Sequence, residues 1–374
     1  MNKKIRVVYI SNESLDFTFS GTAKLIKEGF LKRNMEVIEL VEPIPKIGWV
    51  NILKSLIFRL FRSVYIYKRD NYVINKLLKR INSKLKNIEY DIVFSHYEWL
   101  LCYLNTEKPI FCWPDNFFTD FVNFYSQPWS TLSINNGIAQ SKSYYKKASA
   151  TFFSSEWALN TAKKTEWTRG DLYFIPYGIG TSKVDNTPNK LILETDYLHL
   201  LWIGLDPIRK GLKKSIEIVN QLNSKGMKSR LHVIGLDAFL ENPFTIYHGR
   251  LMKSNSIQLK QFQDILTQSD FLLFPTEADC TPMVIGEALS NGVPVISHNV
   301  GGIPSVMDSS CGKLFELSSE PFEISNWILK TAKDPQRLSE MKVNAKKFAQ
   351  ENLSWEKSID QVVRIISNKL TTSH

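Results

Sequence analysis

The sequence predicts an α/β protein of two domains, each built on a doubly wound parallel sheet. Its 374 residues are enough for two domains of ordinary size, and hydrophobic residues make up 43% of them, enough for two sizeable cores. Strand-like and helix-like segments alternate along the chain, a pattern typical of parallel sheets covered by helices. The polar, proline-containing segment 181–196 interrupts this alternation and is interpreted as a linker. The predicted domains are therefore 1–180 and 197–354.

The first domain opens with a βαβ unit. A short apolar run, Arg6–Ile10, is followed by the loop Ser20-Gly21-Thr22, a helical segment and a second apolar run, Glu36–Val41. Further runs bounded by turn residues predict three more strands. These strands are Asp91–Ser95, Pro109–Trp113 and Ala150–Ser154. Between the second and third strands, apolar residues recur at helical spacing in 49–66 and in 74–85.

The second domain begins again with a strand, His199–Ile203. Alternating helical and apolar segments predict the elements that follow it. They are helices at 211–224, 257–268, 321–333 and 335–351, and strands at 230–235 and 270–274. A last helix is predicted at about 355–370.

The segment Phe274–Val306 is the most informative part of the chain. We expect a helix that begins at Glu287 and ends at Gly292, because helices often end in glycine. The run Val293–Ile296 predicts a buried strand, and Gly301-Gly302 allows a sharp turn or a close approach of the backbone to a ligand. A loop, a helix N-terminus and a strand would then meet at one edge of a parallel sheet. Such an edge favours phosphorylated ligands, because free N–H groups and the helix dipole attract anions.

Composition argues against export and against a membrane span. The N-terminal apolar run VVYI is too short for a signal peptide. The most apolar long stretch, Trp49–Ile66, contains Lys54, Arg59 and Arg62. We therefore expect a cytoplasmic protein that at most associates peripherally with the inner face of a membrane. The four cysteines have no metal-type spacing and are expected to be reduced thiols; they are Cys102, Cys112, Cys280 and Cys311.

Positive charge is concentrated in residues 46–86. This segment contains eleven Lys and Arg and one acid, Asp70, so it carries the whole net charge of +10. Three interpretations stay open: amphipathic helices with solvated basic faces, a surface for anionic lipid headgroups, or a site for another polyanion. The side chains expected at such an acceptor or membrane surface are Lys54, Arg59, Arg62, Lys68 and Arg69.

The segment 274–306 resembles the signature of the retaining glycosyltransferases of family 4, also called glycosyl transferases group 1, which have the GT-B fold. Asp279 stands where the family usually has its first Glu, and Glu287 matches its second Glu. Residues 198–211 and 151–180 are similar to the family's Lys-Gly loop region and to its turn before the linker. The resemblance implies two Rossmann-like domains that face a cleft, with the last helix crossing back to the first domain.

The resemblance also implies a donor site in the second domain. Lys210 and Arg209 would stabilise the departing diphosphate, and Gly204 would lie against the donor. Leu205 stands where the family usually has an Arg, and the neighbouring Arg209 would replace it. The alternative for the Lys–Arg pair is a solvated surface pair.

Two carboxylates complete the implied donor site. Glu287 would bind the ribose hydroxyls, since a carboxylate can accept hydrogen bonds from a vicinal diol; otherwise it is a first-turn Glu favoured by the helix dipole. Asp279 would accept hydrogen bonds from the sugar. The N–H groups of Met283 and Val284 would cradle phosphate or sugar, whereas Pro282 has no N–H to offer.

In the first domain, Gly21, His96 and Asp115 are expected to lie on loops that face the cleft, with Glu156 as a weaker candidate. The alternatives are a plain turn for Gly21, a structural role for His96 and a helix N-cap role for Asp115.

The sequence therefore predicts a hexosyltransferase, retaining by resemblance. It would move a sugar from a nucleotide-sugar donor to a glycan or glycolipid acceptor, in the synthesis of cell-surface polysaccharide or glycoconjugate. No metal ligand pattern is visible, so neither a metal nor a cofactor is expected. Departures from the family pattern at Asp279, Pro282 and Leu205 keep open a non-catalytic nucleotide-sugar or glycan-binding module. The basic segment keeps open a transferase that glycosylates DNA bases, although nucleic acid is not the expected partner.

Overall fold

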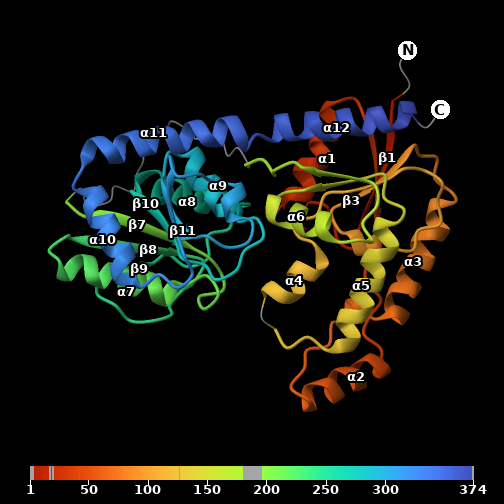
Figure 1. Cartoon of the computed structure of the whole chain (residues 1–374), viewed down its shortest axis with the longest axis horizontal. Coiled ribbons are helices and arrows are strands. Elements are labelled where there is room, and N and C mark those ends of the chain that lie inside the picture. Colours follow the sequence, from red (N-terminus) through yellow and green to blue (C-terminus); the bar gives the residue numbers. More distant parts are fainter. Residues whose placement is uncertain (1–3, 17, 19–20, 126, 180–195, 373–374) are drawn as a thin grey trace. The chain divides into compact units, whose positions relative to one another are not determined.

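The computed structural model describes residues 4–16, 18, 21–125, 127–179 and 196–372 (Figure 1). Within this part the chain forms two compact units. Unit 1 contains residues 1–177 and 355–374, and unit 2 contains residues 178–354. Each unit has one six-stranded sheet in which every pairing of neighbouring strands is parallel. The predicted α/β class with two doubly wound sheets is confirmed. The predicted linker, except Asp196, lies outside the described residues.

The sheet of unit 1 has the strand order β2-β1-β3-β4-β5-β6. Its strands are β1 (Arg6–Ser11), β2 (Glu36–Val41), β3 (Ile92–Ser95), β4 (Ile110–Cys112), β5 (Ala150–Phe153) and β6 (Asp171–Phe174). The chain leaves β1 toward β2 and then returns to the other side of β1 at β3, so the strand order reverses between β1 and β3. Ligands of doubly wound sheets bind beside such a reversal, at the carboxyl ends of the strands.

Seven α-helices of the described chain belong to unit 1. They are α1 (Thr22–Lys32), α2 (Trp49–Leu60), α3 (Asn71–Leu85), α4 (Phe118–Phe124), α5 (Thr131–Tyr145), α6 (Glu156–Lys164) and α12 (Trp355–Thr372). The C-terminal helix α12 packs on α1. A Cβ atom added to Gly29 would lie 2.7 Å from Ile359 Cγ1, and Arg33 Nε donates to Asp360 Oδ1 at 2.6 Å.

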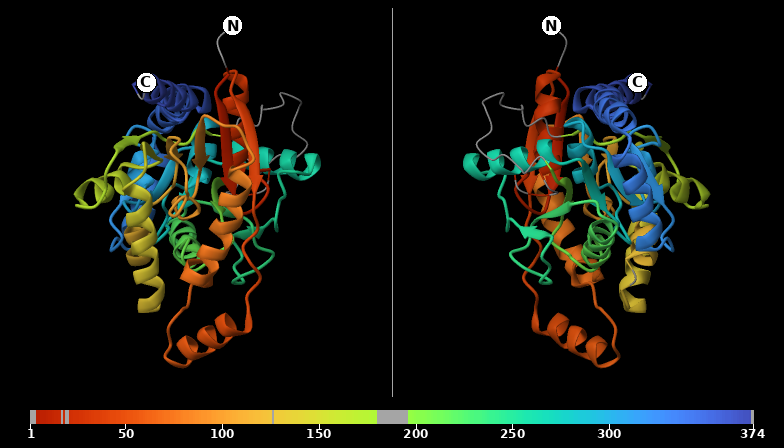
Figure 2. Two further views of the ribbon diagram at one scale, coloured as in Figure 1. Left: turned by 90° about the vertical axis from the view of Figure 1, so that its right-hand side faces the viewer. Right: turned by 90° about the vertical axis from the view of Figure 1, so that its left-hand side faces the viewer.

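Helices α2 and α3 are both apolar at helical spacing, but they pack differently. α3 buries the five apolar residues whose spacing predicts it: Ile74, Leu77, Leu78, Ile81 and Leu85. α2 has one buried residue, Asn51, and its apolar side chains are exposed except for the half-buried Phe58. Figure 2 shows α2 at the far end of unit 1 from the two chain termini. Of these two helices, only α3 is therefore an ordinary amphipathic helix that packs on a core.

The sheet of unit 2 has the order β12-β11-β10-β7-β8-β9. Its strands are β7 (Leu198–Ile203), β8 (Ser229–Ile234), β9 (Thr245–Tyr247), β10 (Phe271–Phe274), β11 (Val295–His298) and β12 (Gly312–Phe315). Its helices are α7 (Leu212–Ser224), α8 (Ser256–Gln268), α9 (Met283–Ser290), α10 (Pro321–Ala332) and α11 (Pro335–Asn352). Here the order reverses between β7 and β10.

The sequence-based bounds are wrong for two elements of the segment 274–306. Helix α9 begins at Met283 rather than at Glu287, and strand β11 occupies Val295–His298 rather than Val293–Ile296. Gly286 obscures the helix in the sequence because glycine lowers helix propensity. The fold needs this glycine, since a Cβ atom there would lie 2.8 Å from Ile179 Cγ1.

Two further expectations concern cysteines and membranes. All four cysteines are buried thiols. Among the described residues, no helix combines the length and the apolar character that crossing a membrane requires.

Candidate functional site

Two loops of unit 2 meet where its strand order reverses. β7 and β10 are adjacent and parallel, with Phe271 beside Leu200. The loop 204–211 follows β7, and the loop 275–282 follows β10. Both loops therefore leave the carboxyl edge of the sheet side by side, which is where an open α/β sheet binds its ligands.

Gly211 brings these two loops into contact. Its φ of +69° lies in the left-handed region, and a Cβ atom there would be 2.1 Å from the carbonyl oxygen of Pro275. Only glycine fits this position. Two further bonds hold the loop: Trp202 Nε1 donates to the carbonyl oxygen of Lys210 at 2.9 Å, and the N–H of Arg209 donates to Asp206 Oδ1 at 3.1 Å.

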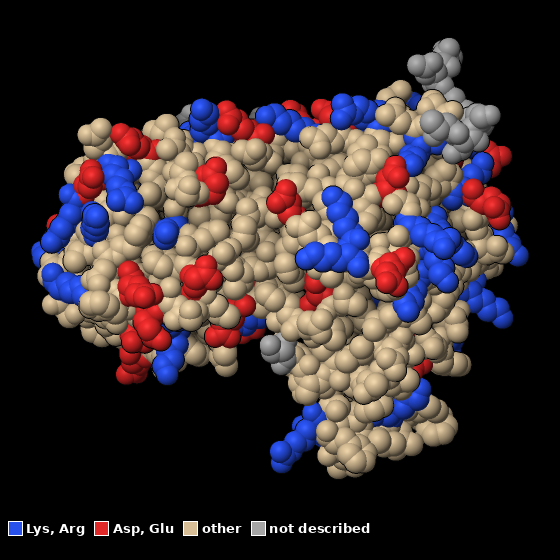
Figure 3. All heavy atoms as spheres, in the orientation of Figure 1, with Lys and Arg blue, Asp and Glu red and all other residues tan. Residues whose placement is uncertain are grey.

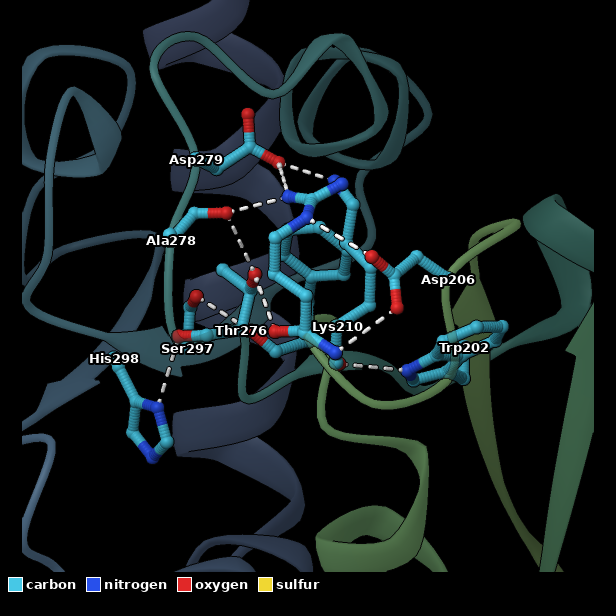
Figure 4. Close-up of polar contacts among 10 residues, drawn as sticks. Trp202, Asp206, Lys210, Thr276, Ala278, Asp279, Ser297 and His298 are labelled. Carbon is cyan, nitrogen blue, oxygen red and sulfur yellow. Dashed lines mark hydrogen bonds and ion pairs between the residues drawn. The ribbon is translucent and has the colours of Figure 1, made fainter. Parts of the chain in front are cut away.

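The loops bring together Lys210, Arg209 and Asp279 (Figure 4). Lys210 Nζ forms an ion pair with Asp279 Oδ2. Arg209 Nη1 donates to the carbonyl oxygen of Ala278 at 2.6 Å and lies 3.8 Å from Asp279 Oδ2. The side chains of Lys210 and Asp279 are only 15% and 12% exposed. Arg209 is 31% exposed and also pairs with Asp206 Oδ2 at 3.3 Å. Two cations thus lie at the carboxyl edge with Asp279 between them, and Lys210 is the shielded one.

Helix α9 begins directly after this cluster. Met283 and Val284 are its first two residues, and Pro282 is its N-cap without a side-chain bond. N–H groups in the first turn of a helix have no carbonyl partner within the helix, and they carry the positive end of its dipole. The N–H groups of Met283 and Val284, which are predicted to bind phosphate or sugar, therefore lie at the N-terminus of a helix.

Glu287 is the fifth residue of α9, so its alternative role as a first-turn Glu is wrong. Its side chain is 16% exposed and forms an ion pair with Lys253 Nζ through Oε1. The other oxygen, Oε2, is buried and has no hydrogen-bond partner within the described chain. A buried carboxylate oxygen without a partner costs free energy. A hydroxyl of a bound ligand could remove that cost.

Sequence reasoning missed Lys253 and His298. Lys253 lies between β9 and α8, outside any motif, and its ammonium group also lies 4.6 Å from the ring centroid of Phe262. His298 ends β11, where its Nδ1 lies 3.0 Å from the carbonyl oxygen of Thr276. Because a carbonyl oxygen only accepts, Nδ1 is the donor. Burial lowers the pKa of His298 to about 4, so a neutral imidazole supports the loop after β10. Its position two residues after the predicted strand Val293–Ile296 is the available signal in the sequence.

The unit 1 candidates also share one sheet edge. Gly21, His96 and Asp115 follow β1, β3 and β4, which are neighbours in the sheet. Gly21 is the N-cap of α1 with φ 82°. His96 Nδ1 lies 3.2 Å from the hydroxyl of Tyr9, and burial lowers the pKa of His96 to about 3. Glu156, the weaker candidate, is the exposed first residue of α6.

The N-cap alternative for Asp115 is wrong for the helix that follows it. α4 begins at Phe118, and its N-cap is Phe117. Asp115 Oδ1 instead accepts a hydrogen bond from Asn116 Nδ2 at 2.5 Å.

Two of the five basic side chains expected at the surface are used inside unit 1. Lys54 Nζ lies 2.7 Å from Asp70 Oδ2. Arg69 is 12% exposed, lies 2.9 Å from Glu98 Oε1 through Nη2, and stacks over the ring of Phe118 at 4.4 Å. The remaining three, Arg59, Arg62 and Lys68, are exposed. The expectation of an outward-facing cation is therefore wrong for Arg69, and the charge of Lys54 is neutralised by Asp70.

No group of three or more His, Cys, Asp or Glu side chains in the described part of the chain is arranged to hold a metal ion.

Comparison with solved structures gives the fold. Sucrose-phosphate synthase of Thermosynechococcus elongatus aligns with a TM-score of 0.70 at 13% identity, over 99% of this chain and 100% of that chain. HepE of Anabaena, solved in complex with UDP and glucose, aligns with a TM-score of 0.67 at 13% identity, over 97% of this chain and 100% of that chain. At such identities the likeness shows the fold alone.

Two doubly wound parallel sheets, together with this edge of the second one, define a protein of the GT-B class. Residues 184–348 match the family described as "Glycosyl transferases group 1". The chain therefore carries a domain of the glycosyl transferases group 1 family. The predicted resemblance to this family is confirmed for residues 184–348, and the predicted GT-B fold is confirmed by the solved structures. A curated relative, sulfoquinovosyl transferase SQD2 of Arabidopsis thaliana, is 26% identical over 100 residues, which are 26% of this chain and 20% of that protein.

Proposed function

We propose that this protein transfers a sugar, with retention of configuration, from a nucleotide-sugar donor to a glycan or glycolipid acceptor in the synthesis of cell-surface polysaccharide or glycoconjugate. The observation that carries the proposal is the Lys210–Asp279–Arg209 cluster beside the N-terminus of α9. A nucleoside diphosphate is the leaving group whose charge such a cluster matches. HepE, with the same fold, was solved with UDP and glucose, so a uridine nucleotide is the first donor to test.

The proposed chemistry rests on charge that develops at the diphosphate. As the bond between the sugar and the diphosphate breaks, negative charge grows on the departing oxygen. Lys210, Arg209 and the N–H groups of Met283 and Val284 would stabilise it from fixed positions, where they need no reorganisation. Lys210 is paired with Asp279 before the donor arrives. Binding would therefore share the ammonium group between Asp279 and a phosphate oxygen.

The two carboxylates would divide the rest of the donor. Glu287 Oε2, buried and without a partner, would accept a hydrogen bond from a ribose hydroxyl. Asp279, on the loop that also carries the phosphate site, would accept from the sugar. In unit 1, Gly21, His96 and Asp115 would serve the acceptor or the sugar, because they follow the neighbouring strands β1, β3 and β4 and the strand order reverses between β1 and β3.

Thermal-shift measurements with nucleoside diphosphates and nucleotide sugars test donor binding, because a ligand that binds only the folded state raises the melting temperature. We expect a uridine diphosphate to raise it and a nucleoside monophosphate to raise it less. Release of the nucleoside diphosphate from the matching nucleotide sugar then tests catalysis. Binding without release or transfer would instead support the non-catalytic module.

We also propose that the chemical step needs no metal ion, since Lys210 and Arg209 would supply the positive charge at the diphosphate. Turnover should persist in EDTA at the level seen without it. Loss of turnover in EDTA, with recovery on adding magnesium or manganese, would show that these side chains are not sufficient.

A further inference from the structure

Helix α2 presents a continuous apolar face outward. Trp49, Leu53, Leu56 and Leu60 follow one another at spacings of four, three and four residues, so they form one line along the helix. All four are exposed, Trp49 at 77% and Leu60 at 82%. Further exposed apolar side chains lie beside this line; they are Ile47, Val50, Ile52, Ile57, Phe61 and Val64. A contiguous apolar patch of this kind marks an interaction site in a folded protein.

The opposite side of the helix attaches it to unit 1, through Asn51, Lys54 and the half-buried Phe58. The ring of Phe58 stacks on that of Tyr65, with 5.7 Å between the ring centroids. Asn51 is buried, and its side-chain amide lies 3.1 Å from the hydroxyl of Tyr65. The same hydroxyl donates to Asp70 Oδ2 at 2.7 Å, and Lys54 Nζ also donates to that oxygen at 2.7 Å. Asn51 and Lys54 are three residues apart, so they share the inner face of α2. The usual orientation of an amphipathic helix on a soluble domain is thus inverted.

The segments that flank α2 are fixed as well. The hydroxyl of Tyr67 donates to the carbonyl oxygen of Pro45 at 3.1 Å. The N–H of Ile66 donates to Ser133 Oγ at 2.8 Å, and Val64 pairs with Trp129 in an isolated parallel bridge. The apolar face is therefore held outward by an ordered support.

Positive charge surrounds this face. Lys46, Arg59, Arg62 and Lys68 are all exposed, and the one acid of residues 46–86, Asp70, is buried beneath the helix and paired with Lys54. Figure 3 shows the surface over α2 as largely uncharged, with Lys and Arg at its margins. Arg and Lys at the borders of an apolar helix face are typical of helices that lie in the headgroup region of anionic bilayers.

We propose that α2 is an interfacial anchor that inserts Trp49, Leu53, Leu56 and Leu60 into an anionic membrane, with Arg59, Arg62, Lys46 and Lys68 at the lipid headgroups. A second copy of this chain is the less favourable occupant. A symmetric pair of α2 faces would place the same basic side chains opposite one another, with no exposed acid in residues 46–86 to compensate. The anchor does not depend on the proposed transfer reaction, so either can fail alone.

Flotation of the full chain with vesicles tests the anchor. We expect the protein to float with vesicles of phosphatidylcholine and phosphatidylglycerol at low salt, to float less at high salt, and to remain unbound with phosphatidylcholine alone. The triple variant Leu53→Ser, Leu56→Ser, Leu60→Ser should bind at least about tenfold more weakly, since each leucine loses the gain from leaving water.

A matched control separates this face from general surface hydrophobicity. The variant Ile257→Ser, Leu317→Ser, Val343→Ser removes three exposed apolar side chains of unit 2 and should float like the original protein. For charge, Lys46→Gln, Arg59→Gln, Lys68→Gln should lower affinity by up to about fivefold per residue. The exposed lysines Lys213, Lys346 and Lys347, changed to Gln, are its control.

A probe on the helix reports insertion directly. Because the four native cysteines are buried, Leu56→Cys can be labelled selectively in the folded protein with an environment-sensitive fluorophore. Its emission should shift to the blue on adding phosphatidylglycerol vesicles, and the same probe at Val343→Cys should not respond. Absence of flotation at low salt, or equal flotation of the leucine variant, would overturn the proposal. The proposal would also be overturned if the original protein were a dimer in sedimentation velocity, the leucine variant were a monomer, and neither protein bound vesicles.

Discussion

Lys210 is the side chain on which the proposed donor chemistry depends most. It is shielded, its ammonium group is paired with Asp279, and it lies 4.6 Å from the ring centroid of Phe274. Lys210→Ala should weaken binding of the nucleoside diphosphate about tenfold to a hundredfold, since a hydrogen bond to a charged group contributes roughly 1.5–3 kcal/mol. Calorimetric titration measures this loss. Lys213→Ala, an exposed lysine on α7, is the control and should bind as before; unchanged affinity in Lys210→Ala would remove Lys210 from the phosphate site.

The two carboxylates should fail in different assays. Glu287→Gln should weaken binding of the free ribonucleoside diphosphate about tenfold, because it loses the charge of a carboxylate that has one oxygen without a partner. Asp279→Asn should leave that binding nearly intact and lower kcat of sugar transfer more strongly. Glu277→Gln, an exposed acid of the same loop, is the control for both assays. Equal losses of nucleotide affinity in the two variants would contradict the division of roles.

Among the elements, α9 is positioned by close packing at Gly286. Alanine there would favour the helix by roughly 1 kcal/mol through propensity, but its Cβ would lie 2.8 Å from Ile179 Cγ1 and 3.6 Å from Leu353 Cδ1. Overpacking typically costs about 1–3 kcal/mol, so we expect Gly286→Ala to be destabilising in urea unfolding. Adding Ile179→Ala should cost less in the Gly286→Ala background than alone. If the two substitutions acted independently in this double-mutant cycle, the contact between Gly286 and Ile179 would not be what positions α9.

The helices and strands also show which parts of the fold could be predicted from the sequence. Strongly patterned segments are found close to their predicted bounds, because their periodicity is set by burial on one face. Helix α11 ends one residue later than predicted, and α3 ends at Leu85 as predicted but begins three residues earlier, at Asn71. The edge strands β6, β9 and β12 are not predicted; short edge strands are only partly buried and carry a weak apolar pattern. The outward orientation of α2 could not be predicted either. Spacing defines an apolar face but not what covers it.

At the scale of unit 2, three histidines form a buried chain across neighbouring strands. His199 Nδ1 lies 2.9 Å from His232 Nε2, and His232 Nδ1 lies 2.9 Å from His248 Nε2. A neutral imidazole offers one donor and one acceptor, so both hydrogen bonds can form with all three histidines neutral. Burial, followed by the neighbouring His248, His199 and Arg230, lowers the pKa of His232 to about 3.

The three linked histidines predict that the folded protein loses stability in acid. The folded pKa of His232 lies below its unfolded value of about 6.5, so the unfolded state binds more protons between these two values. The free energy of unfolding should therefore fall as the pH drops below about 6.5, by up to about 1.4 kcal/mol per pH unit from this histidine. Urea unfolding at a series of pH values measures the slope. In His232→Asn the free energy of unfolding should fall less steeply as the pH drops, by the contribution of one bound proton. An unchanged slope would show that His232 does not control this pH dependence.

Across the whole molecule, the central residues of the proposed donor site could be predicted from the sequence, while its supporting residues could not. Lys210, Arg209 and Asp279 follow β7 and β10, and the carboxyl ends of neighbouring parallel strands meet at one edge. Lys253 and His298 reach the site through loop conformation and side-chain direction. Neither leaves a periodic signal in the sequence.

The return of α12 to α1 has a consequence for biosynthesis. Gly29 and Arg33 meet Ile359 and Asp360 across more than three hundred intervening residues. During translation, α1 is made long before α12, so this contact cannot form until the last helix has been synthesised. Unit 1 must wait, with the surface of α1 that later binds α12 open to water or to a chaperone. A nascent chain that stops before Trp355 would therefore carry a first unit without its last helix.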